Sequence, residues 1–143
     1  MRILIALLIL LAGLMLYIRL APTSIERWHV RPTATEPLDA QEEGGFKVAR
    51  RITAPAAEVL AAFEQRALAT PRTTLLAGSA GEGLLTFQTR SLIWGFPDYT
   101  TVTVEGDLLI IYGRLRFGRS DMGVNKARIL GWLASLGPLT EPL

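Results

Sequence analysis

The uncharged run at the N-terminus constrains the fold of this chain more than any other feature. Residues Ile3 to Ile18 contain no charged side chain. As an α-helix they extend about 24 Å at ~1.5 Å per residue, slightly less than a bilayer core of ~30 Å. Arg19 follows, but its long side chain can reach the lipid headgroups, so that Leu20 and Ala21 extend the span. The sequence therefore predicts a transmembrane signal-anchor over residues 1–21.

A cleaved signal peptide is the competing interpretation, because a basic start and an apolar centre fit both. No A-x-A-like cleavage site follows, and Arg19 stands where such a site needs small residues. These features favour a retained anchor that contacts the membrane through Ile3–Ala21. A literal count of the basic residues after the run favours a cytoplasmic domain, whereas signal-anchors with short basic starts usually export it. Our hypothesis is a single-pass protein of the cytoplasmic (inner) membrane with its domain on the periplasmic side.

Residues 22–45 are predicted to form a tether. The segment carries three prolines and ends in Gly44-Gly45, a composition that disfavours regular structure. Trp28 interrupts it, and an indole in a polar segment is expected to dock on the domain or at the membrane interface. His29 is the single histidine of the chain. Without carboxylate or thiolate companions at ligand spacing, it predicts no metal site.

Composition narrows the classes of partner. Fifteen Lys and Arg residues stand against thirteen Asp and Glu, for a net charge of +2. This surplus is too small for a polycationic surface, so nucleic acid is not an expected partner.

The lack of cysteine excludes disulfides, thiol nucleophiles and thiolate metal sites. The glycine-rich run at residues 78–83 lacks the lysine of a P-loop and is predicted to be a hairpin loop. We expect no cofactor.

Residues 46–137 are predicted to form one small domain, followed by a tail at 138–143. Strands are expected near residues 46–52, 73–77, 84–91, 99–104 and 108–117, and helices near 56–67 and 120–136. This order predicts an α+β domain: a curved antiparallel sheet of about five strands with two helices on one face, similar in element order to helix-grip domains. Met122, Ile129 and Trp132 are expected on the buried face of the last helix.

Two short patterns carry a family resemblance. FPDY at Phe96–Tyr99 is followed by RLRFGRSDMGVNKARI at Arg114–Ile129. They resemble the family called domain of unknown function 1499, with Asp98 on the first pattern. The residues on the second pattern are Arg116, Gly118, Ser120, Asp121, Gly123, Asn125 and Arg128. Tyr99 stands where a second acid is common in that family. The resemblance implies a small, usually exported or membrane-attached domain of bacteria and plastids without an assigned activity.

The second pattern has a functional and a structural interpretation. In the functional one, guanidinium groups near the start of the last helix bind an anionic lipid or an envelope protein. The candidates for this role are Arg90, Arg114, Arg116, Arg119 and Arg128. In the structural one, glycines serve a tight corner, a short polar residue caps the helix, acids neutralise arginines, and an amide ties the helix to the strand. The residues with these roles would be Asp98, Gly118, Ser120, Asp121, Gly123 and Asn125.

These patterns predict an uncharacterised, membrane-anchored envelope protein with a non-catalytic binding or structural domain. The alternative is a carrier of an apolar ligand or lipid in a cavity under the last helix. The residues expected to line that cavity are Phe63, Leu85, Phe87, Ile111 and Leu133. An enzyme of unknown class is less favoured, because the sequence shows no recognisable pairing of a serine with a histidine that could activate it.

Overall fold

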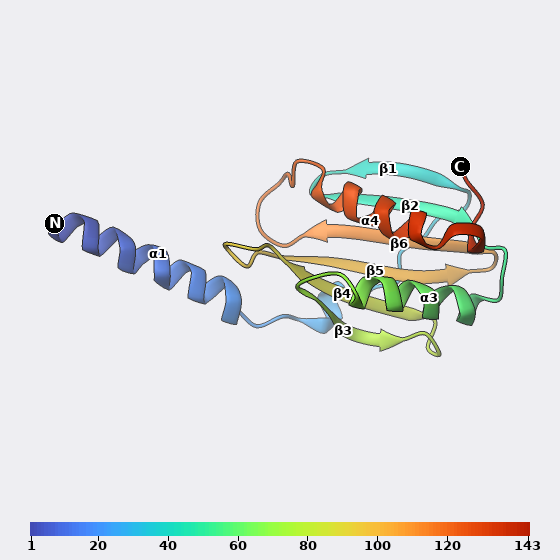
Figure 1. The fold of residues 1–143 in the computed structure, drawn as a ribbon, viewed down its shortest axis with the longest axis horizontal. Coiled ribbons are helices and arrows are strands. Elements are labelled where there is room, and N and C mark those ends of the chain that lie inside the picture. Colours follow the sequence, from blue (N-terminus) through green and yellow to red (C-terminus); the bar gives the residue numbers. More distant parts are fainter.

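The computed structural model describes residues 1–143, and its main body is a six-stranded antiparallel sheet with two helices on one face (Figure 1). The strands are β1 (Leu38–Glu42), β2 (Gly45–Arg51), β3 (Thr73–Ser79), β4 (Leu84–Arg90), β5 (Pro97–Glu105) and β6 (Leu108–Leu115). The helices are α1 (Arg2–Leu20), α2 (Ile25–Trp28), α3 (Ala56–Leu68), α4 (Val124–Ser135) and the short 3₁₀ helix η1 (Gly137–Leu139). The predicted α+β class is confirmed, with one strand more than expected.

α1 extends away from this body as an exposed helix (Figure 1). It is long and apolar enough to cross a membrane, although a signal sequence near the N-terminus would meet the same criterion. Ile18 is its one buried residue, in the last turns of the helix next to the domain. The N-terminal segment is therefore a candidate membrane anchor or signal sequence.

The strand order in the sheet is β1-β2-β6-β5-β4-β3. Antiparallel pairs join β3 to β4, β4 to β5 and β5 to β6, and β6 then pairs with β2. α3 carries the chain from β2 to the far edge strand β3, and it shares one face of the sheet with α4 (Figure 1). This topology places different connections at the two ends of the sheet. The β4–β5 loop and the connection from β6 to α4 lie at the end next to α1 (Figure 1).

β1 and α2 lie inside the segment that was predicted to be a tether. The residues of β1 alternate between half-buried and exposed, and Gly44, with a φ of 67°, turns the chain into β2. The polar composition of Leu38–Glu42 concealed this strand. It is an edge strand, where solvated charged side chains are tolerated and also discourage pairing with other chains.

Side chains fill the space between the two helices and the sheet. The ring centroid of Phe63 lies 5.8 Å from that of Phe87 and 5.5 Å from that of Trp132. All five side chains that were expected to line a ligand cavity belong to this one core cluster: Phe63, Leu85, Phe87, Ile111 and Leu133. The contacts that a carrier would offer to an apolar ligand are thus made within the core of the domain.

α4 begins later than its periodicity predicted. The expectation for Met122 is wrong: this residue has a φ of 52° and is 95% exposed. Gly123, the N-cap residue, has a φ of 81°. Two successive left-handed residues turn the chain before the helix starts, and so remove Met122 from the helical repeat. Ile129 and Trp132 are buried as expected.

Candidate functional site

The sheet face opposite the helices is covered by residues 22–31, which we call the strap. Ser24 caps the short helix α2 by accepting a hydrogen bond from the Arg27 amide. The helix ends in Trp28, whose ring stacks on Tyr99 of β5 with centroids 4.3 Å apart. Only 7% of Trp28 is exposed. Trp28 therefore docks on the domain, which was one of its two expected positions.

Polar side chains add hydrogen bonds between the strap and the sheet. The Thr23 and Tyr99 hydroxyl oxygens are 3.1 Å apart, and His29 Nδ1 lies 2.8 Å from Thr86 Oγ1. His29 thus has a structural partner. No group of three or more His, Cys, Asp or Glu side chains is placed to hold a metal ion.

Three arginines of this face bind the strap and the end of α1, and we call them the arginine clamp. They are Arg90, Arg114 and Arg116. Arg90 reaches the helix itself, since it donates to the carbonyl oxygens of Ile18 at 3.3 Å and Arg19 at 3.2 Å. Arg116 donates to the carbonyl oxygen of Pro22 at 2.8 Å. The domain therefore contacts the last turn of α1 directly.

Arg114 binds the strap at Trp28, farther along the chain than these two contacts. It donates to the carbonyl oxygen of Trp28 and, at 2.9 Å, to Thr101 Oγ1. Its guanidinium carbon lies 5.4 Å from the Trp28 ring centroid and 4.9 Å from that of Tyr112. Burial lowers the pKa of Arg114, but a guanidinium stays charged in proteins. An irregular segment leaves carbonyl groups without backbone partners, and the fork of N–H donors on arginine satisfies them.

The corner between β6 and α4 gathers the acids of the family pattern. Arg128 Nη1 lies 3.3 Å from Asp98 Oδ2, and the two side chains are only 14% and 15% exposed. Asp121 accepts hydrogen bonds from the amides of Gly123 at 2.9 Å and Asn125 at 2.8 Å. Pairing of Asp98 and capping by Asp121 are the contacts that the structural interpretation requires.

Asn125 is fully buried beneath this corner. Its Oδ1 accepts from Arg128 at 3.1 Å, while its Nδ2 has no hydrogen-bond partner. Gly113 of β6 faces it: a Cβ at this position would lie 2.8 Å from both Asn125 Oδ1 and Ile129 Cδ1. Helix α4 therefore crosses β6 more closely than a side chain at position 113 would allow.

The polar loop before α4 completes the corner. Gly118 has a φ of 91°, a conformation that glycine adopts without strain. Ser120 Oγ accepts a hydrogen bond from the Met122 amide at 3.3 Å. The glycine and serine of the pattern therefore shape the turn from strand to helix.

A hollow of about 320 Å³ opens at this corner. It is lined by Ser91, Phe96, Asp98, Leu115, Phe117, Ser120, Asp121, Met122 and Val124. Its two carboxylates accept hydrogen bonds and repel anions, whereas its aromatic and aliphatic walls suit an apolar group. The hollow can therefore accommodate an apolar group that bears a hydroxyl or ammonium donor.

The two acids of the hollow titrate in opposite directions. Burial raises the pKa of Asp98, and the charge and hydrogen bond of Arg128 offset only part of that effect. Burial also acts to raise the pKa of Asp121, but hydrogen bonds from Asn125 and Gly123 together lower it. Asp121 is consequently the acid that stays ionised to lower pH.

The five arginines predicted as an anion or partner site do not form one cluster. Three make up the clamp, and Arg128 pairs with Asp98. The Arg119 side chain is 92% exposed and lies 4.0 Å from Glu43, which is itself 79% exposed. An anion-binding role for these arginines stays a prediction, and Arg119 offers the most accessible guanidinium.

Sequence reasoning missed the partner of the clamp. Alternation along β6 placed Arg114 and Arg116 on one face of the sheet, but no pattern indicated that the strap would lie across them. The available signal was that arginines outnumber acids on that face, because guanidinium groups without acidic partners need other hydrogen-bond acceptors.

Comparison with known proteins identifies a family. A family model described as "Protein of unknown function (DUF1499)" matches residues 24–136. The match includes most of the strap as well as the sheet and both packed helices. A search of curated proteins gives no match.

Proposed function

The chain belongs to the DUF1499 family, and we propose that it is a membrane-anchored, non-catalytic binding domain that the arginine clamp holds in a fixed orientation at the membrane surface. The clamp is the observation that carries this proposal. Its first member, Arg90, binds carbonyl oxygens within the last turns of α1, at Ile18 and Arg19. No free linker separates the helix from the domain. If α1 spans a bilayer, the domain lies directly on the headgroups.

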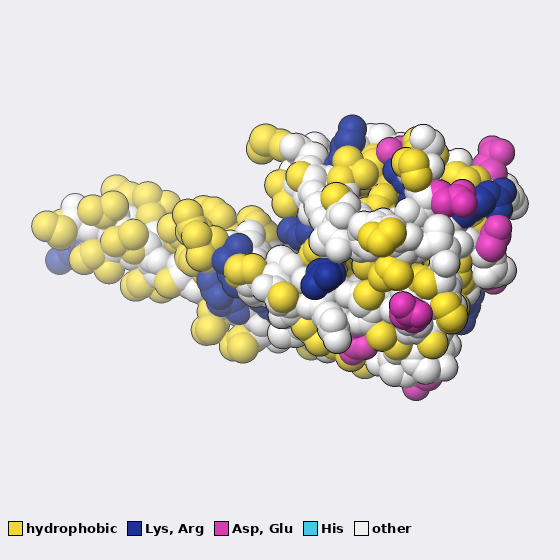
Figure 2. Space-filling view, turned by 45° about the vertical axis from the view of Figure 1, so that its right-hand side comes forward, with side chains coloured by type: hydrophobic (Ala, Val, Ile, Leu, Met, Phe, Trp, Pro, Cys, Tyr) yellow, Lys and Arg dark blue, Asp and Glu magenta, His cyan; other side chains and the backbone are white.

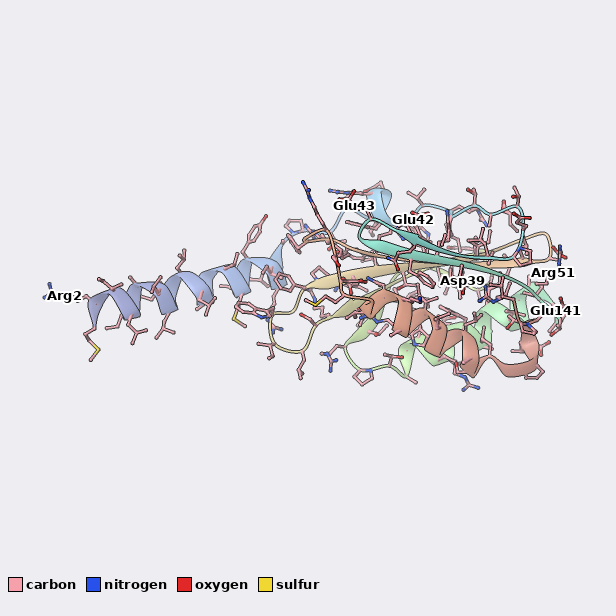
Figure 3. The ribbon with its side chains drawn as sticks, turned by 90° about the horizontal axis from the view of Figure 1, so that it is seen from above. Arg2, Asp39, Glu42, Glu43, Arg51 and Glu141 are labelled. Carbon is pink, nitrogen blue, oxygen red and sulfur yellow. The ribbon has the colours of Figure 1, made fainter.

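The distribution of charge supports a partner at that surface. In the view of Figure 2, Lys and Arg side chains gather where α1 joins the domain, and most acidic side chains lie on the part farther from the helix. Arg2 lies at the free end of α1, whereas Arg51 and Glu141 lie at the opposite end of the molecule (Figure 3). Basic side chains next to a membrane attract anionic headgroups. We therefore include anionic lipid or an acidic envelope protein as the partner of the exposed Arg27 and Arg119.

The orientation can be measured because the chain has no cysteine. Cysteines introduced at the exposed positions Leu16 on α1 and Lys126 on α4 would carry spin labels in full-length protein reconstituted into nanodiscs. We expect a narrow distance distribution between the labels. The double substitution Arg90→Gln and Arg116→Gln should broaden it, whereas Arg119→Gln, outside the clamp, should not. A broad distribution in the unsubstituted background would refute the fixed orientation.

The membrane side needs a separate measurement. We expect the full chain to resist alkaline extraction from membranes and a C-terminal alkaline phosphatase fusion to be active, as it is only in the periplasm. An inactive phosphatase fusion together with a fluorescent cytoplasmic reporter would instead assign the domain to the cytoplasm. Release of the chain by alkaline extraction would contradict anchorage.

A further inference from the structure

The loop between β4 and β5 exposes a group of large apolar side chains. Leu92 is 71% exposed and Ile93 68%, and Trp94 and Phe96 are 36% and 37% exposed. The Trp94 and Phe96 rings stack on each other, with centroids 6.2 Å apart. None of the four belongs to a core cluster of the domain. A contiguous exposed apolar group of this kind marks an interaction surface.

This loop is fixed beside the last turn of α1. Arg19 donates a hydrogen bond to the carbonyl oxygen of Ile93 at 2.9 Å. Gly95 packs so closely on the same arginine that a Cβ there would lie 2.9 Å from Arg19 Cζ. Arg90 binds the carbonyl oxygens of Gly95 at 2.8 Å and Ile18 at 3.3 Å. One guanidinium thus holds both the loop and the helix, which brings the exposed side chains to the end of α1.

The connection from β6 to α4 extends the same surface. The Phe117 ring centroid lies 6.1 Å from that of Phe96, and Met122 is 95% exposed. Both connections lie at the end of the sheet next to α1 (Figure 1). We call this surface the apolar end; its members are Leu92, Ile93, Trp94, Phe96, Phe117 and Met122. The hollow at the corner opens between its two parts.

We propose that the apolar end inserts into the interfacial layer of the bilayer that α1 crosses, as a second membrane contact that does not span it. This inference rests on the proposed anchorage of α1. Its occupant is lipid because the surface is continuous with the end of the anchor through the Arg19–Ile93 hydrogen bond. Its composition fits that layer: tryptophan favours the headgroup level, and the stem of arginine crosses apolar surroundings while its charge stays among the headgroups.

Tryptophan fluorescence tests this contact in the full chain. The protein has three tryptophans; Trp28 and Trp132 are 7% and 6% exposed, whereas Trp94 is 36% exposed. The chain would be reconstituted into vesicles whose lipids carry bromine either near the headgroup or near the end of the acyl chain. We expect stronger quenching by the shallow bromine, and most of that quenching should disappear in Trp94→Phe. Equal emission in brominated and ordinary lipid would overturn the proposal.

Charged substitutions separate this contact from the anchorage. Leu92→Glu with Ile93→Glu should abolish the Trp94-dependent quenching while the chain still floats with the vesicles. Leu68→Glu, which alters an apolar residue on α3 that is 46% exposed, is the matched control and should leave the quenching unchanged. Loss of flotation in the unsubstituted chain would refute the anchorage itself. Protection of Trp94 from aqueous acrylamide without quenching by either brominated lipid would show a protein partner, or a second copy, on this surface and overturn the lipid assignment.

Discussion

Gly113→Ala tests the close approach of α4 to the sheet, on which the corner depends. The added Cβ would lie 2.8 Å from Asn125 Oδ1 and 2.8 Å from Ile129 Cδ1. Carbon atoms in folded proteins prefer separations of about 3.5–4.0 Å. The Ile129 methyl group can rotate away, but Asn125 Oδ1 is held by Arg128 at 3.1 Å. The substitution therefore pushes the helix away from the strand and weakens that hydrogen bond.

The expected loss of stability combines these two effects. Overpacking of a well-filled site costs about 1–3 kcal/mol, and a hydrogen bond to a charged group contributes about 1.5–3 kcal/mol. Because relaxation relieves part of each, we expect the free energy of unfolding to fall by about 2–5 kcal/mol. With a urea dependence of about 2 kcal/mol per molar, the midpoint of domain unfolding should fall by about 1–2.5 M.

The assay is urea unfolding of the full chain in detergent micelles, followed by near-ultraviolet circular dichroism of the buried aromatic residues. Gly131→Ala is the matched control, since it makes the same change on α4 where no atom beyond the local helix backbone lies within 4 Å of the added Cβ. It should stabilise the domain by about 0.5–1 kcal/mol because alanine is the better helix former. A Gly113→Ala midpoint equal to that of the unsubstituted protein would refute the close packing of α4 on β6.

Three further changes probe the strap, the cap and the exposed charges. Trp28→Ala should lower the free energy of unfolding by about 3 kcal/mol, as expected for a buried indole, and urea unfolding measures it. Asp121, with its lowered pKa, contributes stability that is present above the unfolded value of 3.8 and is lost as pH falls through the folded pKa. Asp121→Asn retains a capping side chain, so its urea midpoint should decline less on acidification; an unchanged decline would contradict the assignment. Substitution of Arg27 and Arg119 by Gln should reduce the enrichment of anionic lipid around the chain in mixed-lipid nanodiscs, measured by native mass spectrometry, and the reduction should disappear at high salt.

The sequence predicted the elements whose patterns are periodic. Alternation along β6 and the 3.6-residue repeat of α3 gave nearly correct bounds. Asn125, expected to tie the helix to the strand, is buried, but its hydrogen-bond donor Arg128 lies on the same helix. Two features had no periodic signal. β1 is a polar edge strand of five residues, and the left-handed Met122 lies in a turn that the helical repeat cannot describe.

The candidate site was predictable only in part for a similar reason. Hydrogen bonds from side chains to backbone carbonyls, such as that from Arg116 to Pro22, leave no pattern at the accepting position, because every residue has a carbonyl group. The pairing of Asp98 with an arginine could be predicted on the basis of charge alone. To predict the partner of the clamp, the path of the strap has to be known, and that path depends on where Trp28 docks.

The strap makes the fold of the domain depend on the segment next to the anchor. Both Tyr99 and Arg114 lie on the sheet face that the strap covers. Without the strap, the Tyr99 ring would lose the indole that stacks on it, and the Arg114 guanidinium would lose the Trp28 carbonyl that accepts its hydrogen bond. The family match also begins before the sheet, at residue 24. A fragment that starts at Phe46, where the first predicted strand begins, would expose this face and lack β1 as well. A fragment that starts at Pro22 would retain the Arg116 contact, the Trp28–Tyr99 stack and β1, while lacking the Arg90 contact with Ile18 and Arg19. The Pro22 fragment should therefore fold, and its failure to do so would mean that α1 is itself part of the folding unit.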